Sequence, residues 1–235
     1  MKERLCVTDF HSHILPVDHG CKDIQQTVKQ LALMHSFGTQ AVVATPHFYP
    51  EMHTVSDFSS LVDNALFQVR QMEDIKSPAL FLGAEVLFCH NLHKMEGIDS
   101  LCIKGTKIIL LELTSDVEGN GQAECVEQLL ANGYTVVLAH IDRYLKANDH
   151  SIRDLISLGA KAQINADAFY SVALQKKLRY YLEDTDSVVA IGSDLHGNNK
   201  ISYLSFSKLS KHLGDTYGRI MKQTESLLED AQRIL

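Results

Sequence analysis

The sequence is poor in the features that mark secreted, membrane-spanning or nucleic-acid-binding proteins. Its 5 cysteines are scattered and form no Cys-x-x-Cys pair, so neither a disulfide framework nor a thiolate zinc site is indicated. Apolar runs such as 108–111 and 135–139 are far shorter than the roughly 20 residues of a membrane-spanning helix. Only 22 lysines and arginines stand against 29 acidic residues, which argues against binding to a nucleic-acid backbone.

What remains is the composition of an ordinary globular protein with an unusual number of histidines. Of 235 residues, 45% are hydrophobic and 22% are charged, which is enough to bury a large core. No linker or low-complexity segment interrupts the chain, so we expect one domain over residues 1–235. The amino terminus reaches Asp9 before any apolar stretch long enough for a signal peptide, which predicts a cytoplasmic protein. The 12 histidines, in a chain of net charge −7, are the feature to explain.

Short β-rich runs alternate with helical patterns along the whole chain. The expected strands are Leu5–Phe10, Gln40–Thr45, Ala79–Val86, Thr106–Leu113, Tyr134–His140, Ala160–Asn165 and Ser187–Ser193. The expected helices are Ile24–Phe37, Val55–Ile75, Gln122–Asn132, Ser151–Leu158, Ala168–Glu183, Tyr203–His212 and a last one from Gly214 onward. Gly38, Gly133 and Gly159 stand where C-cap glycines are expected. This alternation predicts a parallel α/β sheet or a closed barrel.

Each expected strand runs into a side chain that can bind a metal ion or form a hydrogen bond. In parallel α/β folds, the chemistry collects at the carboxyl ends of the strands. The residues found there are His11, His13, His47, Glu85, Glu112, His140, Asn165, Asp194 and His196. Glu112 is especially informative, because a carboxylate inside so apolar a run is costly unless it is paired with an arginine or bound to a metal.

These candidates offer nitrogen and oxygen but no sulfur. Such a ligand set suits Mn²⁺, Fe, Zn²⁺ or Mg²⁺ and disfavours a structural zinc site. There are more candidate ligands than one ion can use, and carboxylates can bridge two ions. The sequence therefore predicts a cluster of two or three divalent metal ions, of the kind that activates water and binds phosphoryl oxygens.

The segments that contain these residues resemble the polymerase and histidinol phosphatase (PHP) superfamily. Within it, the chain is most similar to the bacterial, manganese-dependent protein tyrosine phosphatases of capsule and exopolysaccharide operons. The matching blocks are Asp-Phe-His-Ser-His-Ile-Leu-Pro (9–16), Ala-Thr-Pro-His (44–47), Gly-Ala-Glu-Val (83–86), Leu-Leu-Glu-Leu (110–113), Leu-Ala-His-Ile-Asp-Arg-Tyr (138–144) and Gly-Ser-Asp-Leu-His (192–196). The resemblance implies a distorted, TIM-like (β/α)7 barrel of seven strands.

The resemblance also implies which residues hold the metal ions. It places the ligands on His11, His13, His19, His47, Glu85, Glu112, His140, Asp194 and His196. Glu85 would be the bridging carboxylate. The subfamily usually has Asp-Asp-Gly where this chain has Asp18-His19-Gly20. Because other members of the superfamily have a histidine there, we expect His19 to be a ligand and keep Asp18 as the alternative.

Two basic residues are candidates for binding the substrate phosphate. Arg143 matches an arginine that the family uses for this purpose, and the planar fork of a guanidinium suits phosphate. A second family arginine should follow the Asp-x-His motif, but this chain has none there. Lys200 is the nearest basic residue and is the expected substitute.

The resemblance implies hydrolysis of phosphotyrosine on a protein, by a metal-bridged hydroxide that attacks phosphorus in line. The implied partner is a bacterial tyrosine kinase in capsule or exopolysaccharide biosynthesis. The chain has no Cys-x5-Arg loop, so the cysteine-dependent tyrosine phosphatase mechanism is excluded. One alternative is a phosphatase for a small molecule such as histidinol phosphate. Another is a catalytically weakened metal-binding regulatory protein, which the altered turn at His19 and the missing arginine would suggest.

Overall fold

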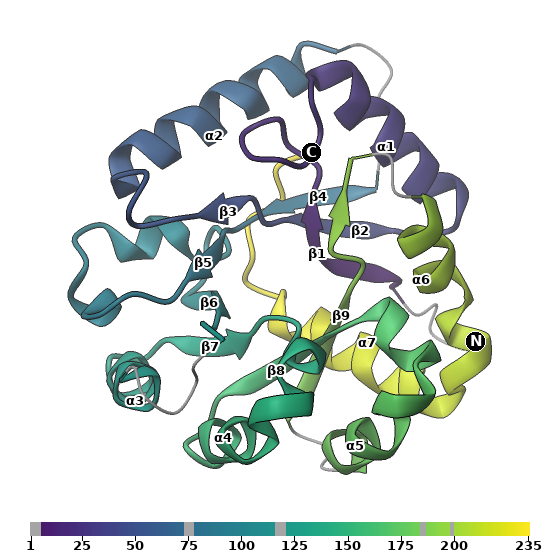
Figure 1. Ribbon diagram of the computed structural model, residues 1–235. Helices are drawn as coiled ribbons and strands as arrows, with labels where there is room; N and C mark the ends of the chain where they lie inside the picture. The colour runs from purple at the N-terminus through teal and green to yellow at the C-terminus, as the bar shows by residue number, and fades with distance from the viewer. Residues whose placement is uncertain (1–5, 73–77, 116–120, 184–186, 198–199) are drawn as a thin grey trace.

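The structure, a computed structural model, describes residues 6–72, 78–115, 121–183, 187–197 and 200–235, without the side chains of 200–202. Within these residues the strands are β1 (Thr8–His13), β2 (Ala41–Ala44), β3 (His47–Phe48), β4 (Ala79–Leu82), β5 (Glu85–Leu87), β6 (Ile108–Glu112), β7 (Thr135–Leu138), β8 (Lys161–Asn165), β9 (Val188–Gly192) and β10 (Leu195–His196). The α-helices are α1 (Ile24–Ser36), α2 (Val55–Arg70), α3 (Gln122–Ala131), α4 (Leu145–Ser157), α5 (Val172–Glu183), α6 (Lys200–Leu213) and α7 (Asp215–Leu227). Figure 1 shows the strands around a common centre and helices α1 to α5 outside them.

The strands form two sheets, and the strand pairs among the described residues are parallel. The first sheet has the order β10-β1-β2-β4, and the second has the order β3-β5-β6-β7-β8-β9. The predicted α/β fold with parallel strands is therefore confirmed. Parallel pairing also brings the carboxyl ends of neighbouring strands to the same side of the molecule.

The sequence predicts seven strands, whereas ten are found in the described part of the chain. Residues 79–86, predicted as one strand, form β4, which pairs with β2, and β5, which pairs with β3 and β6. The break falls at Gly83, where a Cβ atom would lie only 3.1 Å from Cγ1 of Ile103. Pro46 separates β2 from β3, because proline has no N–H to donate to a strand ladder. The two-residue strands β3 and β10 follow the second and seventh predicted strands.

The helices agree with the prediction more closely than the strands do, with differences at their ends. Helix α5 begins at Val172, because residues 166–170 form a 3-10 helix instead of its first turn. Helix α4 begins at Leu145 rather than at residue 151, with a non-helical residue at Asn148. Residues 73–75 of the second predicted helix lie outside the described residues. Gly133 and Gly159 have φ of 83° and 115°, as expected for glycines that end helices.

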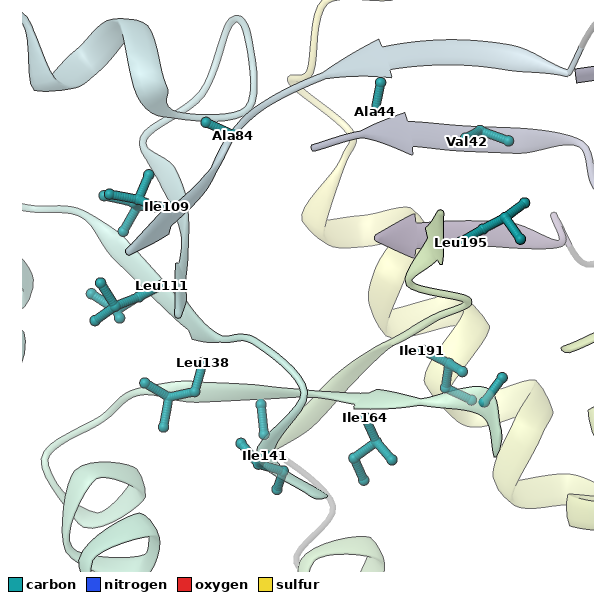
Figure 2. Close-up of a cluster of buried hydrophobic side chains, with 14 of the residues drawn as sticks. Val42, Ala44, Ala84, Ile109, Leu111, Leu138, Ile141, Ile164, Ile191 and Leu195 are labelled. Atoms are coloured by element: carbon teal, nitrogen blue, oxygen red, sulfur yellow. The ribbon is translucent and has the colours of Figure 1, made fainter. Parts of the chain in front are cut away.

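Alternation along the strands divides the hydrophobic core into two clusters. Ile109, Leu111 and Leu138 point away from the centre of the ring of strands and pack beneath the helices, as Figure 2 shows. Their neighbours Leu110 and Val137 face inward instead, because successive side chains of a strand point to opposite faces. The inner cluster consists of Phe10, Val43, Ile103, Ile108, Leu110, Val137, Ala139, Val189, Ala190 and Leu228.

Helix α7 supports this inner cluster. Leu228, which directly follows α7, is part of the cluster, and Thr224 Oγ1 donates a hydrogen bond of 2.7 Å to the carbonyl of Val189 in β9. Apolar side chains thus fill the space among the strands, and the polar residues collect at the strand ends. None of the helices in the described residues has the length and hydropathy needed to cross a membrane.

A β-bulge in β1 turns two histidines inward. Asp9 pairs with Val42 and Ser12 pairs with Ala44, so that β1 has one more residue than β2 between these pairs. The extra residue interrupts the alternation of the strand. Phe10 can therefore belong to the inner core while His11, the next residue, also faces the centre. Strand β1 extends to His13, three residues beyond its predicted end.

Candidate metal centre

Eight of the nine predicted metal ligands come together at or near the ends of strands. His11 and His13 lie in β1, His47 and Glu85 begin β3 and β5, Glu112 ends β6, His140 follows β7, Asp194 follows β9 and His196 lies in β10. Contacts no longer than 3.8 Å join all eight into one group, which we call the cluster. The ninth predicted ligand, His19, lies beside this group.

Glu85 is the centre of the cluster and is fully buried. Its Oε2 atom lies 3.1 Å from Nε2 of both His11 and His13. The same oxygen lies 3.0 Å from Nδ1 of His47, and Oε1 lies 2.6 Å from Nε2 of His140. Burial raises the pKa of Glu85, but the charges and hydrogen bonds of the imidazoles, first that of His11, outweigh it and hold the pKa well below its usual range. One carboxylate thus contacts four histidines.

Two further carboxylates flank Glu85 at longer distances. Asp194 Oδ1 lies 3.4 Å from His13 Nε2 and 3.5 Å from His196 Nδ1. Glu112 Oε1 lies 3.7 Å from His140 Nε2, and Glu112 Oε2 lies 3.8 Å from His47 Nδ1. Most of these contacts are longer than hydrogen bonds. Two ligand atoms about 2.1 Å from one ion are separated by about 3.0 Å or more, so these distances suit atoms that share a metal ion.

Several buried atoms of the cluster have no hydrogen-bond partner among the described residues. They are Nδ1 of His47 and of His140, Oε2 of Glu85, Oδ1 of Asp194 and Nε2 of His196. A buried polar atom without a partner is costly, by about 1–3 kcal/mol, unless something else satisfies it. Three groups have ligand atoms within 4.8 Å of one another: His11, His13 and Glu85; His47, Glu85 and Glu112; and His13, His47 and His196. The residues present therefore fit divalent metal ions bound through nitrogen and oxygen.

Asp18 and His19 lie differently from each other. His19 is exposed, and its ring centroid lies 4.8 Å from those of His47 and His196. Asp18 Oδ2 accepts hydrogen bonds from His13 Nδ1 at 2.8 Å and from the His47 N–H at 2.9 Å, and its Oδ1 accepts one from the Gly20 N–H at 2.7 Å. With both oxygens occupied, Asp18 orients His13 instead of facing the cluster.

Two cluster residues have backbone conformations that are unusual for residues with side chains. His140 has φ of 31° and Asp194 has φ of 49°. Such conformations cost of order 1–3 kcal/mol and persist only where the surroundings fix them. Here the His140 N–H donates to Gln163 Oε1 at 2.6 Å, and the Asp194 N–H donates to the His11 carbonyl at 2.8 Å. Hydrogen bonds thus hold both residues in place.

Comparison with known proteins places this centre in a family. The model of the capsular polysaccharide synthesis family CpsB/CapC matches residues 7–234. The chain belongs to the CpsB/CapC family. It is 29% identical over 205 residues to the tyrosine-protein phosphatase CpsB of Streptococcus pneumoniae, covering 80% of this chain and 82% of that protein. The resemblance to capsule-type tyrosine phosphatases that the motifs predict is confirmed.

Two solved structures share the fold of this CpsB/CapC family member. A chain from the crystal structures of YwqE from Bacillus subtilis and CpsB from Streptococcus pneumoniae, described as metal-dependent tyrosine phosphatases, matches with a TM-score of 0.76 and 21% identity. The match covers 97% of this chain and 96% of that one. The phosphotriesterase homology protein of Escherichia coli matches with a TM-score of 0.55 and 14% identity, covering 95% and 98%. At these identities the likeness concerns the fold.

Arg143, predicted to bind phosphate, lies at the edge of the cluster. It ends the 3-10 helix η3 (Ile141–Arg143) that directly follows His140. Its Nη1 lies 3.2 Å from His140 Nε2, and its Nη2 donates a hydrogen bond to Asp194 Oδ2. The side chain is 48% exposed, so the guanidinium is open to a ligand from solvent. Lys200 begins α6, but its side chain lies outside the described residues.

Tyr49 forms a wall beside the cluster. Its ring stacks on that of His47, with centroids 4.9 Å apart and planes 18° apart. Burial, followed by the charge of Glu112, raises the pKa of Tyr49 to about 12, so its hydroxyl stays protonated at neutral pH. The same side chain borders a pocket of about 270 Å³ that is lined by Tyr49, Pro50, Glu51, Met52, Leu87, Phe88 and Cys89.

Two buried polar residues that touch the cluster, Asp9 and Gln163, have no role predicted from the sequence. Asp9 Oδ1 accepts hydrogen bonds from the N–H groups of Ser193 at 2.8 Å and His11 at 3.3 Å, and burial raises its pKa to about 6. Gln163 is fully buried, and its Oε1 atom lies 3.1 Å from His11 Nδ1. Gln163 could have been predicted from its position between the apolar residues Ala162 and Ile164. Because successive side chains of a strand point to opposite faces, this position places a polar side chain on the inner face of a buried strand.

The six histidines without a predicted role make no hydrogen bond, ion pair or ring contact with the cluster in the described part of the chain. They are His35, His53, His90, His93, His150 and His212. On the surface of α4, His150 Nδ1 lies 2.8 Å from Asp154 Oδ2. His212 Nε2 lies 3.1 Å from the carbonyl oxygen of Phe169. The histidines thus divide into a group at the strand ends and a scattered remainder.

Proposed function

We propose that this chain is a metal-dependent protein tyrosine phosphatase that hydrolyses the phosphomonoester of phosphotyrosine. The observation that carries the proposal is Glu85, a buried carboxylate that contacts four histidines and whose Oε2 atom makes no hydrogen bond among the described residues. Arg143, at the edge of this centre, supplies the positive charge that a phosphate needs. The relatives' names as tyrosine-protein phosphatases support the same substrate class.

The proposed ligands are the eight residues of the cluster together with His19 as the outermost one. They would hold two or three divalent ions, with Mn²⁺ as the best candidate and Fe, Zn²⁺ or Mg²⁺ as substitutes. When bound, such ions act as Lewis acids toward phosphoryl oxygens and make water a stronger nucleophile. Glu85 would bridge neighbouring ions, because its two oxygens face different histidines.

Residues at the edge of the cluster would bind the substrate. The guanidinium of Arg143 would hold two phosphoryl oxygens at once, which orients the phosphorus toward the cluster. Lys200 would add a second, less directional positive charge. Tyr49 would form one face of the slot for the phosphotyrosine ring, since its own ring already stacks against His47.

The proposed barrel has seven strands if three interruptions are disregarded. β2 and β3, β4 and β5, and β9 and β10 would then each count as one strand. The pairs of β1 with β2 and with β10, and of β8 with β9, support a ring that closes on itself. The cytoplasmic location, the single domain and a tyrosine kinase of capsule or exopolysaccharide synthesis as partner stay predictions.

The test compares substrates and variants in the presence of Mn²⁺. The wild-type protein should hydrolyse a phosphotyrosine peptide far better than histidinol phosphate. His11→Ala should lose bound metal and activity together. Arg143→Ala should keep its metal and lose about 10²–10³-fold in kcat/KM, because a charged group that binds the transferring phosphoryl is gone.

Arg179→Ala is the matched control, since Arg179 is an exposed arginine that pairs with Glu183 on α5. It should leave both metal content and activity unchanged. Activity confined to histidinol phosphate would overturn the proposed substrate. Full metal occupancy without hydrolysis of either compound would indicate the metal-binding regulatory protein instead.

A further inference from the structure

Gln163 lies behind the cluster, on the inner face of β8, and is fully buried. Its Oε1 atom lies 2.6 Å from the backbone nitrogen of His140 and 3.1 Å from Nδ1 of His11. One amide oxygen therefore contacts two cluster residues, which come from β1 and from the end of β7. Neither residue is near Gln163 in the sequence.

The hydrogen bond from His140 determines where the proton of His11 sits. A backbone N–H can only donate, so the atom of Gln163 that faces it must be the carbonyl oxygen. His11 Nδ1 faces the same oxygen, which can only accept, so Nδ1 must carry a proton. In a neutral imidazole the other nitrogen, Nε2, then has its lone pair free. Nε2 is the atom that faces Glu85 and the rest of the cluster.

The other end of the same amide reaches a second ligand. Gln163 Nε2 donates to Asn165 Oδ1 at 2.9 Å, which leaves the Asn165 amide nitrogen pointing the other way. That nitrogen donates to Asp194 Oδ2 at 3.0 Å. The remaining oxygen, Asp194 Oδ1, faces His13 and has no hydrogen-bond partner among the described residues. A single chain of hydrogen bonds thus runs from His140 through Gln163 and Asn165 to Asp194.

The packing around Gln163 leaves the amide little freedom. A Cβ atom on Gly192, in the neighbouring strand β9, would lie 2.9 Å from Gln163 Nε2 and 2.4 Å from Cβ of His11. Only glycine fits between these two side chains. The Asn165 N–H also donates to Asp142 Oδ1 at 2.9 Å, which ties the end of β8 to the 3-10 helix after β7. The amide is therefore held in one orientation.

We propose that Gln163 is a positioning residue of the metal centre, which fixes the protonated nitrogen of His11 and, through Asn165, the orientation of Asp194. It coordinates nothing itself. Its hydrogen bonds leave the lone pairs of His11 Nε2 and Asp194 Oδ1 free to bind the ions. The inference rests on the proposed function only in that the cluster binds divalent metal, and it does not depend on the substrate.

The test measures the affinity of the metal-depleted protein for Mn²⁺ and Co²⁺ by titration. Gln163→Met keeps the length of the side chain but removes both hydrogen-bonding groups. We expect its metal affinity to fall about 10–100-fold, as for other residues that orient metal ligands. Gln30→Met is the matched control, because Gln30 is also a buried glutamine (4% exposed) but lies in α1, away from the cluster. It should bind metal like the wild type.

Gln163→Glu separates positioning from packing. A glutamate still accepts from the His140 N–H and from His11 Nδ1, but it cannot donate to Asn165. Its affinity should lie between those of the wild type and Gln163→Met. In the Zn²⁺-loaded protein, long-range ¹H–¹⁵N NMR should show His11 protonated at Nδ1 in the wild type and in Gln163→Glu, and should lose that signature in Gln163→Met.

The outcomes separate this inference from the proposed function. If Gln163→Met binds Co²⁺ as tightly as the wild type, with the same absorption spectrum, the inference is wrong although the metal site stands. If Gln30→Met loses as much affinity as Gln163→Met, the effect is general destabilisation and the inference is wrong as well. A wild-type protein that binds no metal would overturn the metal centre itself, whereas one that binds metal without hydrolysing phosphotyrosine would contradict only the activity.

Discussion

The deep and rim halves of the proposed metal centre differ in how firmly their side chains are held. The deep half consists of His11, His13, Glu85 and His140, all with fully buried side chains. The rim half consists of His19, His47, Glu112, Arg143 and His196. At the rim, the exposed fraction of the side chain rises from 7% for His47 to 16% for Glu112, 28% for His196 and 48% for Arg143.

The two histidines of β1 show how the deep half is held. His13 donates from Nδ1 to the carboxylate of Asp18, which lies five residues later in the chain. His11 donates from Nδ1 to the neutral amide of Gln163, which comes from a distant strand. Both imidazoles therefore present Nε2 to Glu85. Fixed deep ligands suit tight binding of ions, and the more open rim leaves room for a phosphate to enter.

The largest expected effect comes from Glu85 in the deep half, and Glu112 in the rim half is its comparison. Glu85→Gln removes the charge that faces four imidazoles, so metal affinity should fall by about 10²–10⁴-fold, the cost of removing one partner of a buried charged group. Glu112→Gln should cost about tenfold, since Glu112 makes longer contacts and is partly exposed. Metal titration of the two variants measures the difference. Equal losses would show that the division into deep and rim halves is wrong.

An intermediate effect is expected for Asp18→Asn, which weakens the support of His13. Burial raises the pKa of Asp18, but the hydrogen bond and the charge of His13 outweigh it and lower the pKa to about 2 from its ordinary value of 3.8. Because the folded pKa is the lower one, charged Asp18 contributes stability that is present above about pH 4 and lost as the pH falls toward 2.

The shift corresponds to about 2 kcal/mol, at 1.36 kcal/mol for each pH unit. Chemical denaturation of metal-free Asp18→Asn should therefore show about that loss of unfolding free energy at pH 7, with the difference from the wild type shrinking as the pH falls to 2. Asp23 caps the start of α1 and lies outside the cluster. Asp23→Asn can therefore lower stability but should leave metal affinity unchanged. A stability difference for Asp18→Asn that does not vary with pH would contradict the role given to the His13 pair.

The smallest effect is expected for His19→Ala. His19 is exposed and meets the cluster through ring contacts with His47 and His196. We expect one ion to bind up to about tenfold more weakly and the other ions to bind as before, because the deep ligands are untouched. Metal content at limiting Mn²⁺ measures this. Loss of all metal from His19→Ala would place this residue in the deep half.

The sequence predicts the parallel α/β fold and the gathering of the histidines, because both follow from local signals. A carboxylate such as Glu112 inside an apolar run, or a histidine such as His140 at its end, is costly unless it is satisfied, and strand ends are where it can be satisfied. These signals need only the order of residues along one strand. They do not depend on which strands become neighbours.

The features that the sequence does not reveal depend on contacts between distant segments. The β1 bulge exists only relative to β2, and the break at Gly83 reflects the position of Ile103. The partnership of Gln163 with His11 needs β8 and β1 to face the same centre. Asp18 illustrates the same limit, since its distance from His13 in sequence gives no sign that its oxygens are already occupied.

The joining of β1 to β10 has a consequence for how the protein folds. His13 pairs with His196, and the Asp194 N–H donates to the His11 carbonyl, so the centre is closed by two strands that lie far apart in the sequence. Contacts so far apart in sequence form slowly, because a long loop must close before they contribute. The predicted ligands cannot all come together until β10 has been made. Metal ions would therefore be captured late, after most of the strands have paired.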